Sequence, residues 1–222
     1  MVSVGIVGNG PLEHIPSLQD FQDSVDVWIG ADRGALTIIE NNLRPVFAAG
    51  DFDSITEMER ERIERNSDAF LEYPVEKDQT DLEIALWQAY DLNPDCIYLF
   101  GVTGGRLDHA MVNMQLLYQL LKRNIRGIIA DRQNLLELAE PGKHSIFHHS
   151  AFPNISFLPF TPEIKGLTLS GFYYPLADET VSWGSTLCIS NKLLSKSGTF
   201  SFEAGILLVI KSRDAEFNAI PR

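Results

Sequence analysis

The fold is decided by residues 25–54, which read VDVWIGADRGALTIIENNLRPVFAAGDFDS. Two β-rich apolar runs, residues 25–29 and 45–49, lie on either side of residues 36–41, which have the character of a helix. A strand, a helix and a second strand in this order indicate parallel strands with the helix packed against them. Each strand runs into glycine and aspartate, so the stretch predicts polar residues at the carboxyl edge of a parallel sheet.

The same alternation of strands and helices continues on both sides of this stretch. Further strands are predicted at residues 2–7, 96–100 and 127–130. Further helices are predicted at residues 57–66, 81–90 and 107–122, the last with apolar residues at clear helical spacing. We therefore predict an α/β domain over residues 1–142, built on a mostly parallel sheet with helices on both faces.

The pattern changes after Pro141-Gly142. Short β-rich runs, separated by Gly, Pro, Ser and Asn, are predicted as strands at residues 155–158, 167–169, 186–189, 199–202 and 206–210. No helical pattern accompanies them. Residues 143–222 are therefore predicted to form an all-β sandwich domain.

The amino-acid composition of the chain argues against some classes of function. The chain has 222 residues, of which 45% are hydrophobic, and a formal net charge of −12 at pH 7 without a Lys/Arg-rich stripe. We expect neither nucleic acid nor a membrane as a partner. The first apolar run ends at Gly8, too short for a secretion signal or a membrane span, which predicts a cytoplasmic protein. Cys96 and Cys188 lie in apolar runs without metal-ligand spacing and are predicted to be free, buried thiols.

The predicted strand ends bring several carboxylates to one edge. Asp32 follows one strand, and Asp51 and Asp53 follow the next. Carboxylates that converge raise one another's pKa values and destabilise the fold, and a divalent cation bound through oxygen would compensate for this repulsion. Asp51 and Asp53 could equally form a turn in which the carboxylates accept hydrogen bonds from backbone N–H groups.

A third acidic segment, Glu76-Lys77-Asp78-Gln79-Thr80-Asp81, precedes a predicted helix. Thr80 would be the N-cap of this helix, and Glu83 would complete a capping box. Asp81 would then lie in the first turn, where the helix dipole favours a carboxylate. Such a helix cap would account for Asp81. It does not explain why all of residues 76–81 are polar.

Gly104-Gly105-Arg106 precedes the longest predicted helix. Glycines allow close approach of a ligand to the backbone, and a guanidinium group suits phosphate. The alternative is a glycine turn in which Arg106 pairs with Asp108. The chain contains neither a P-loop nor a Gly-x-Gly-x-x-Gly motif, so a nucleotide would have to be held in another way.

Four motifs in this order make the chain resemble the bacterial thiamine pyrophosphokinase family. They are Gly30-Ala31-Asp32-Arg33-Gly34-Ala35, Gly50-Asp51-Phe52-Asp53-Ser54, Lys77-Asp78-Gln79-Thr80-Asp81 and Gly104-Gly105-Arg106-Leu107-Asp108-His109. The resemblance continues through residues 169–176, 190–191 and 205–210, and so spans nearly the whole chain.

The resemblance implies an α/β catalytic domain that binds ATP and Mg²⁺, followed by a β-sandwich domain that binds thiamine. It implies transfer of the pyrophosphate of ATP to the hydroxyl of thiamine, with AMP as the second product. It also implies a homodimer in which thiamine binds between the α/β domain of one subunit and the β domain of the other.

The site residues follow from the same resemblance. The metal ligands would be Asp51, Asp53 and Asp81, and these three with Asp32 would form the catalytic set. The residues placed at the nucleotide and its phosphates would be Asp32, Asp78, Gln79, Thr80, Gly104, Arg106 and Asp108. Thiamine would contact Ser190 and Asn191.

Two residues do not follow from the resemblance. Asn9 places a side chain in the first loop, where the family more often has Gly-Gly-Pro, so the role of this loop is open. Trp183 could stack on thiamine or pack in the core, and we leave it outside the predicted site.

Two other functions remain open from the residues alone. In a phosphohydrolase, Asp51 would be the nucleophile and Asp53 the acid. Such an enzyme also needs a downstream lysine and a second acidic strand end, whereas the strand at residues 96–100 leads into Gly101-Val102-Thr103-Gly104-Gly105. The other alternative is a non-catalytic binding protein whose acidic loops hold a structural metal.

Overall fold

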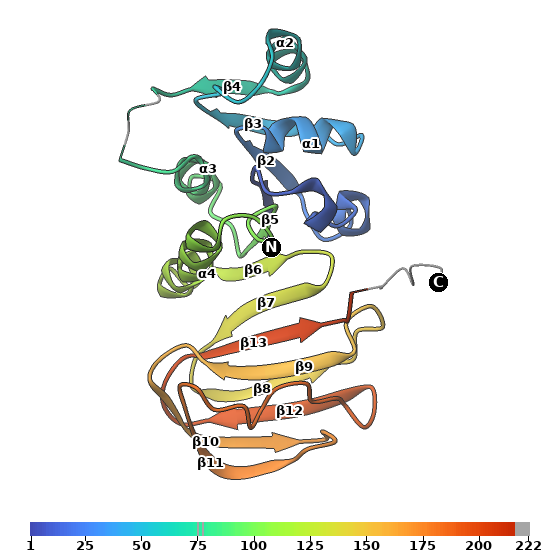
Figure 1. Ribbon diagram of the computed structural model, residues 1–222, viewed down its shortest axis with the longest axis vertical. Coiled ribbons are helices and arrows are strands. Elements are labelled where there is room, and N and C mark those ends of the chain that lie inside the picture. Colours follow the sequence, from blue (N-terminus) through green and yellow to red (C-terminus); the bar gives the residue numbers. More distant parts are fainter. Residues whose placement is uncertain (75, 77, 216–222) are drawn as a thin grey trace, which may run out of the picture. The chain divides into compact units, whose positions relative to one another are not determined.

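The protein forms two compact units, Met1–Arg132 and Gln133–Arg222, in a computed structural model that describes residues 1–74, 76 and 78–215 (Figure 1). The sequence-based division after Gly142 differs from this one by ten residues (142 − 132). The difference concerns β7 (Asn134–Ala139), which pairs antiparallel with β13 (Leu207–Ser212). Because its partner strand lies near the end of the chain, β7 belongs to the second unit.

A parallel sheet forms the centre of the first unit, with strand order β4-β3-β2-β1-β5-β6. Its strands are β1 (Ser3–Val7), β2 (Val27–Ala31), β3 (Pro45–Gly50), β4 (Ala69–Glu72), β5 (Cys96–Phe100) and β6 (Arg126–Ala130). Val7 pairs with Gly30 on one side and with Phe100 on the other, so the carboxyl ends of β1, β2 and β5 are level. The predicted α/β class is confirmed, although the edge strand β4 was not predicted.

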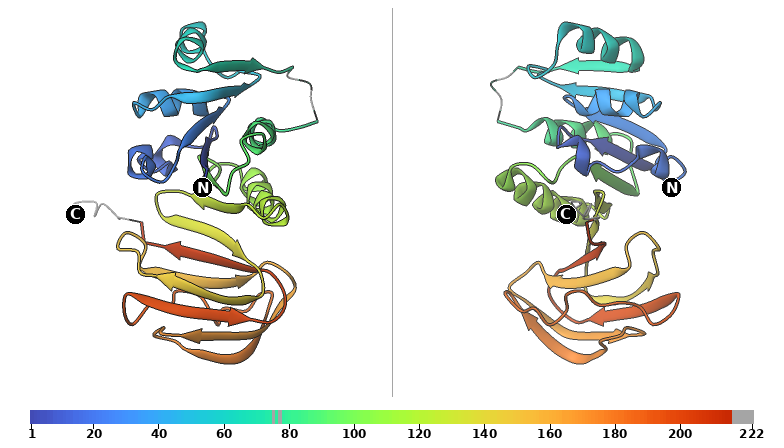
Figure 2. Two further views of the ribbon diagram at one scale, coloured as in Figure 1. Left: turned by 180° about the vertical axis from the view of Figure 1, so that it is seen from behind. Right: turned by 45° about the vertical axis from the view of Figure 1, so that its right-hand side comes forward.

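Four α-helices cover this sheet, α1 (Gly34–Glu40), α2 (Glu57–Asn66), α3 (Asp81–Tyr90) and α4 (Leu107–Lys122). Two short 3₁₀ helices, η1 (Leu12–His14) and η2 (Leu18–Phe21), follow β1. α1 and α3 both contact β1, β2 and β3, and Figure 2 shows α1 and α2 on one face of the sheet and α3 and α4 on the other. The sheet is thus covered on both faces, as parallel sheets require.

The second unit contains two antiparallel sheets. The first has strand order β7-β13-β9, with β9 at Asn154–Pro159. The second has order β11-β10-β12-β8 and consists of β8 (Gly142–Phe147), β10 (Glu163–Ser170), β11 (Leu176–Ser182) and β12 (Ser197–Phe202). Buried side chains from both sheets, including Phe157, Phe200 and Leu207, form one core, so this unit is a β-sandwich as predicted.

The strand pattern of the second unit differs from the prediction in detail. Residues 186–189 were predicted as a strand but form no regular strand and lie largely in turns and bends, and β-bridges appear only beyond them, from Asn191 to Ile155 and from Leu193 to Phe172. The strands β7, β8 and β11 were not predicted. The exposed β11 has one buried residue, Val181, and therefore lacks the apolar alternation that identifies a half-buried strand.

Both cysteines are thiols outside any disulfide among the described residues, as predicted, although only Cys188 is fully buried and Cys96 is half-buried. Burial raises the pKa of the Cys188 thiol to about 11, so this thiol stays protonated. In the part of the chain that the structure describes, no helix combines the length and the apolar character needed to cross a membrane.

Candidate active site

A pocket of about 890 Å³ opens at the carboxyl edge of the parallel sheet. Its lining comes from the loops that follow β1, β2, β3 and β5 and from the first turns of α3 and α4. Three predicted catalytic carboxylates, Asp32, Asp51 and Asp81, line this pocket together with Arg106. These residues, which follow the strands of the parallel sheet, therefore lie together around one cavity.

Asp32 is held in a constrained position. It is only 7% exposed, and its backbone adopts a φ of 51°, the left-handed region that few non-glycine residues enter. Its N–H donates to the Ala49 carbonyl at 2.9 Å. A Cβ on Gly50 would lie 2.9 Å from the Asp32 Cα, so glycine is needed at position 50 to let these two strand ends approach.

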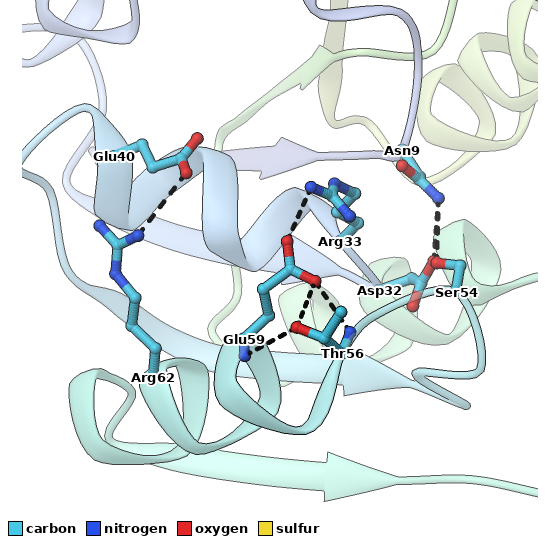
Figure 3. Close-up of polar contacts among 8 residues, drawn as sticks. All are labelled: Asn9, Asp32, Arg33, Glu40, Ser54, Thr56, Glu59 and Arg62. Carbon is cyan, nitrogen blue, oxygen red and sulfur yellow. Dashed lines mark hydrogen bonds and ion pairs between the residues drawn. The ribbon is translucent and has the colours of Figure 1, made fainter.

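The Asp32 carboxylate is held through one of its oxygens (Figure 3). Oδ2 accepts hydrogen bonds from Asn9 Nδ2 at 3.0 Å and from Ser54 Oγ at 2.9 Å. Oδ1 is buried and has no hydrogen-bond partner among the described residues. Buried polar atoms are nearly always paired in native proteins, so an oxygen without a donor is unusual in a buried carboxylate.

The Asp51-Phe52-Asp53 turn is anchored by its apolar middle residue. Phe52 is 4% exposed, has a φ of 54° and stacks on Phe70. Asp53 N–H donates to Asp51 Oδ1 at 3.4 Å, so the turn considered as an alternative is present. Asp53 itself is exposed and does not line the pocket.

The carboxylates of this turn influence one another electrostatically. The negative charge of Asp51 raises the pKa of Asp53 above its ordinary value, and partial desolvation raises it further. Asp32 and Asp81 add smaller contributions in the same direction. Like charges gathered in this way favour binding of a cation.

The segment before α3 contributes Gln79, Thr80 and Asp81 to the pocket. The predicted capping box is confirmed, because Thr80 Oγ1 accepts from Glu83 N–H at 3.3 Å and Thr80 N–H donates to Glu83 Oε2 at 3.1 Å. Asp78 is exposed and does not line the pocket. Lys77, which belongs to the same motif, lies outside the described residues.

Arg106 and Asp108 form an ion pair at the start of α4. Arg106 Nη2 lies 2.6 Å from Asp108 Oδ2, and Nε donates to Oδ1 at 3.1 Å. The guanidinium, aided by a hydrogen bond from the backbone of His109, lowers the pKa of Asp108 to about 2. The predicted alternative, a paired Arg106, is therefore the arrangement found, and both residues still line the pocket.

Gly104 precedes this pair and has a φ of 84°. A Cβ at this position would lie 2.3 Å from the ring of His14, so the loop requires glycine here. The neighbouring Gly105, rather than Gly104, lines the pocket.

The loop after β5 is held by residues that were not predicted from the sequence. Thr103 Oγ1 donates to Asp131 Oδ2 at 2.9 Å, and Asn113 Nδ2 donates to the Val102 carbonyl at 2.9 Å. Asp131 directly follows β6, as Asp51 follows β3, so the strand-end rule could have identified it.

Among the described residues, no group of three or more His, Cys, Asp or Glu side chains is arranged to hold a metal ion by itself. Mg²⁺ is commonly bound by one or two carboxylates together with substrate phosphates and water. The carboxylates of this pocket match the protein part of such a shared site.

The two residues predicted to contact thiamine lie in the second unit. Ser190 is exposed and has a φ of 56°, and its N–H donates to Ser156 Oγ at 3.0 Å. Asn191 is 2% exposed. Its Oδ1 accepts from the N–H groups of Tyr174 and Lys192, and its Nδ2 donates to the Tyr174 carbonyl at 2.8 Å. The Asn191 side chain thus holds the backbone of Tyr174 and of Lys192.

Comparisons with known proteins match most of this chain to one protein family. Residues 18–129 match the family model for the thiamin pyrophosphokinase catalytic domain, and residues 143–207 match the model for the thiamin pyrophosphokinase vitamin B1 binding domain. A thiamine pyrophosphokinase of Bacillus subtilis is 48% identical over 96% of this chain and 100% of its own length. The chain belongs to the thiamine pyrophosphokinase family.

Solved structures of this family have the same fold. The crystal structure of thiamine pyrophosphokinase from Bacillus subtilis matches with a TM-score of 0.90 at 47% identity, covering 96% of this chain and 100% of that chain. The crystal structure from Geobacillus thermodenitrificans matches with a TM-score of 0.86 at 42% identity, covering 97% and 99%. The two family models fall in the two structural units, one in each.

One alternative about the second unit is wrong. Trp183 was considered as a core residue, but it is 64% exposed. It follows β11, whose side chains are mostly exposed. Trp183 is not among the buried residues that form the core between the two sheets.

Proposed function

We propose that this protein transfers the pyrophosphoryl group of ATP to the hydroxyl group of thiamine, giving thiamine diphosphate and AMP. One observation carries the proposal: Asp32, Asp51, Asp81 and Arg106 border one pocket in a member of the thiamine pyrophosphokinase family. Carboxylates and a guanidinium around one cavity suit a cation and a polyphosphate together.

The proposed metal ligands are Asp51, Asp53 and Asp81. Two features of the site support a divalent cation: the raised pKa of Asp53 beside Asp51, and the buried Asp32 Oδ1, to which none of the described residues donates a hydrogen bond. Bound there, Mg²⁺ would offset the negative charge of the phosphate oxygens and align the polyphosphate. The chain's own carboxylates would set its position.

The proposed phosphate and nucleotide contacts are Asp32, Asp78, Gln79, Thr80, Gly104, Arg106 and Asp108. Arg106 is exposed, so it can turn from Asp108 towards a phosphate without unfolding the loop. The exposed backbone of Gly104 and Gly105 offers close approach to an anion. Asp108 would then hold the arginine in place until substrate arrives.

The chemical step proposed is an in-line displacement at the β-phosphorus of ATP. A bond forms between the thiamine hydroxyl oxygen and the β-phosphorus, and the bond from that phosphorus to the bridging oxygen of the α-phosphate breaks. AMP leaves with the bridging oxygen, and the hydroxyl proton passes to solvent or to a pocket carboxylate. We assign no general base, because a loose transition state needs little help from one.

Thiamine is proposed to contact the second unit through Ser190, with Asn191 fixing the backbone beside it. We also propose a homodimer whose active site contains residues of both subunits, acting in the cytoplasm. The second unit exposes several large apolar side chains, which support an interface. They are Tyr173, Tyr174, Trp183, Leu187, Ile189 and Leu194.

An assay for AMP tests the function. The protein is incubated with ATP, Mg²⁺ and thiamine, and the nucleotides are separated by chromatography. AMP and thiamine diphosphate are expected in equal amounts, with neither formed when thiamine is omitted. Release of inorganic phosphate with a trapped aspartyl-phosphate would instead identify a phosphohydrolase, and binding without turnover would identify a binding protein.

Mixed dimers test the shared site. Asp51→Asn and Ser190→Ala variants are expected to be nearly inactive alone and to recover activity when unfolded and refolded together, since each mixed dimer would hold one intact site. Refolding either variant by itself is the control. A monomer in light scattering would count against the dimer, and a dimer that recovers no activity on mixing would count against a site shared between subunits.

A further inference from the structure

Asp32 is the meeting point of three loops. Asn9 follows β1, Asp32 follows β2 and Ser54 lies in the loop after β3. The hydrogen bonds from Asn9 and Ser54 both end on Asp32 Oδ2, and Asn9 Nδ2 also lies 3.5 Å from Ser54 Oγ (Figure 3). The side chains therefore tie together the ends of three parallel strands.

The backbone around Asp32 is also held from the opposite side. The Asp32 N–H donates to Ala49, and the Asp32 carbonyl accepts from Ala35 N–H at 3.2 Å. The next residue, Arg33, pairs with Glu59 of α2 at 2.8 Å. With its backbone fixed at a φ of 51°, the orientation of the Asp32 carboxylate depends on what its two oxygens contact.

The two oxygens of this carboxylate differ in their hydrogen bonds. Oδ2 has two donors, whereas Oδ1 is buried without one among the described residues. A buried acceptor without a donor lowers stability, so a purely structural carboxylate would be expected to share its donors between both oxygens. Both donors thus act on one oxygen of a residue that lines the pocket, and Oδ1 receives no hydrogen bond from the described residues.

We infer that Asn9 and Ser54 are positioning residues that orient the Asp32 carboxylate for the reacting substrates. They act through Oδ2, which accepts both of their hydrogen bonds, and so fix the orientation of the carboxylate in a residue that lines the pocket. The inference rests on the proposed function for its kinetic consequence. It also gives a role to Asn9, the residue at which the first loop departs from the family pattern.

The surroundings of the two donors make the inference testable. Asn9 and Ser54 are exposed, whereas the carboxylate that they hold is buried. Replacing either donor by alanine removes a hydrogen bond without opening a cavity in the core. Both donors reach the same oxygen, so one of them can still hold the carboxylate when the other is lost.

The experiment compares Asn9→Ala, Ser54→Ala, the double variant and Ser54→Thr, which keeps the hydroxyl. The double variant is expected to lower kcat by about 10–100-fold, as is typical when residues that support a catalytic group are removed. KM for thiamine is expected to stay within about threefold, and Tm is expected to change little. Ser54→Thr is expected to retain most of the activity of the wild type.

The matched control is Asn66→Ala. Asn66 is exposed at the end of α2, away from the pocket-lining residues, and donates to the Arg62 carbonyl at 2.7 Å, so its loss should leave kcat unchanged. The inference is overturned if the double variant keeps wild-type kcat. It is also overturned if kcat and Tm of the double variant fall together and Ser54→Thr does not retain activity.

A second readout separates this inference from the proposed function. If the wild-type protein forms no AMP, the proposed function fails by itself. Binding of a non-hydrolysable ATP analogue with Mg²⁺, measured by calorimetry, then decides the inference. About tenfold weaker binding by the double variant than by Asn66→Ala would support it, and equal binding would overturn it.

Discussion

Phe52 stacks on Phe70 with ring centroids 4.4 Å apart and an angle of 20° between the rings. This contact belongs to a core cluster that also contains Ala48 and Ile63. Since Phe52 is buried and its neighbours on both sides are aspartates, the stacking fixes the turn that presents Asp51 and Asp53. An apolar contact thus determines where two charged groups lie.

Replacing Phe52 by alanine should therefore weaken both the fold and the site. Loss of a buried phenylalanine typically costs about 3–5 kcal/mol, and alanine at a φ of 54° relieves no strain. We expect the free energy of unfolding, measured with urea, to fall by about that amount. Phe70→Leu, which keeps most of the apolar volume, should cost less than about 1.5 kcal/mol. A loss below 1 kcal/mol for Phe52→Ala would contradict this account.

The aspartates of this turn should matter for activity and not for folding. Asp51→Asn and Asp53→Asn are each expected to lower the rate of AMP formation by at least about 100-fold, because a neutral amide is a poor cation ligand. Asp53→Asn should also raise Tm in metal-free buffer, since it removes a charge that Asp51 repels. Near-normal turnover in both variants would rule out the proposed metal ligands.

The raised pKa of Asp53 has a definite consequence for stability. The folded state binds the Asp53 proton more tightly than the unfolded state, whose pKa is near the ordinary 3.8. This group's contribution to stability therefore falls as the pH rises from 3.8 to the raised pKa, and it stays lost above that pH. The carboxyl carbon of Asp53, followed by NMR without metal, should titrate above 3.8 in the wild type and closer to 3.8 in Asp51→Asn. Equal titration in both proteins would contradict the assigned cause.

Arg106 should be needed for phosphate and not only for pairing with Asp108. We expect Arg106→Ala to lower kcat/KM for ATP by about 100-fold, and Arg106→Lys to recover little, because lysine cannot make the bidentate contact. The control is Asp108→Asn, which removes the pairing partner and keeps the guanidinium.

Asp108→Asn is expected to lower kcat/KM by less than about tenfold if Arg106 acts on phosphate. An equal loss in Asp108→Asn and Arg106→Ala would instead mean that the ion pair itself is what matters. The pKa of Asp108, about 2 beside the arginine, should rise towards the ordinary value in Arg106→Ala.

Local pattern predicted most of the first unit. The bounds of α2, α3 and α4 agree with the prediction, since helical periodicity and caps such as Thr80 with Glu83 are local features. The edge strand β4 was missed because its four residues are too few for a periodic signal. The proposed roles of the site residues stay predictions.

The second unit was harder to predict because its strands depend on distant partners. β7 pairs with β13, and the segment around Asn191 pairs with Ile155, far apart in the chain. Residues 186–189 are apolar enough for a strand but lie in turns. Likewise, nothing local distinguishes the exposed Trp183 from a core residue.

The sequence by itself determined the fold class and the acidic and glycine-rich strand ends, because hydrophobic periodicity and turn residues act over a few positions. The tertiary structure alone decided which of these groups meet. In the folded chain, Asn9 and Ser54 donate to the same oxygen of Asp32, and Arg106 pairs with Asp108. The side chain of Asn191 hydrogen-bonds to the backbone of Tyr174. Such contacts depend on strand order and register, which join residues that no local pattern connects.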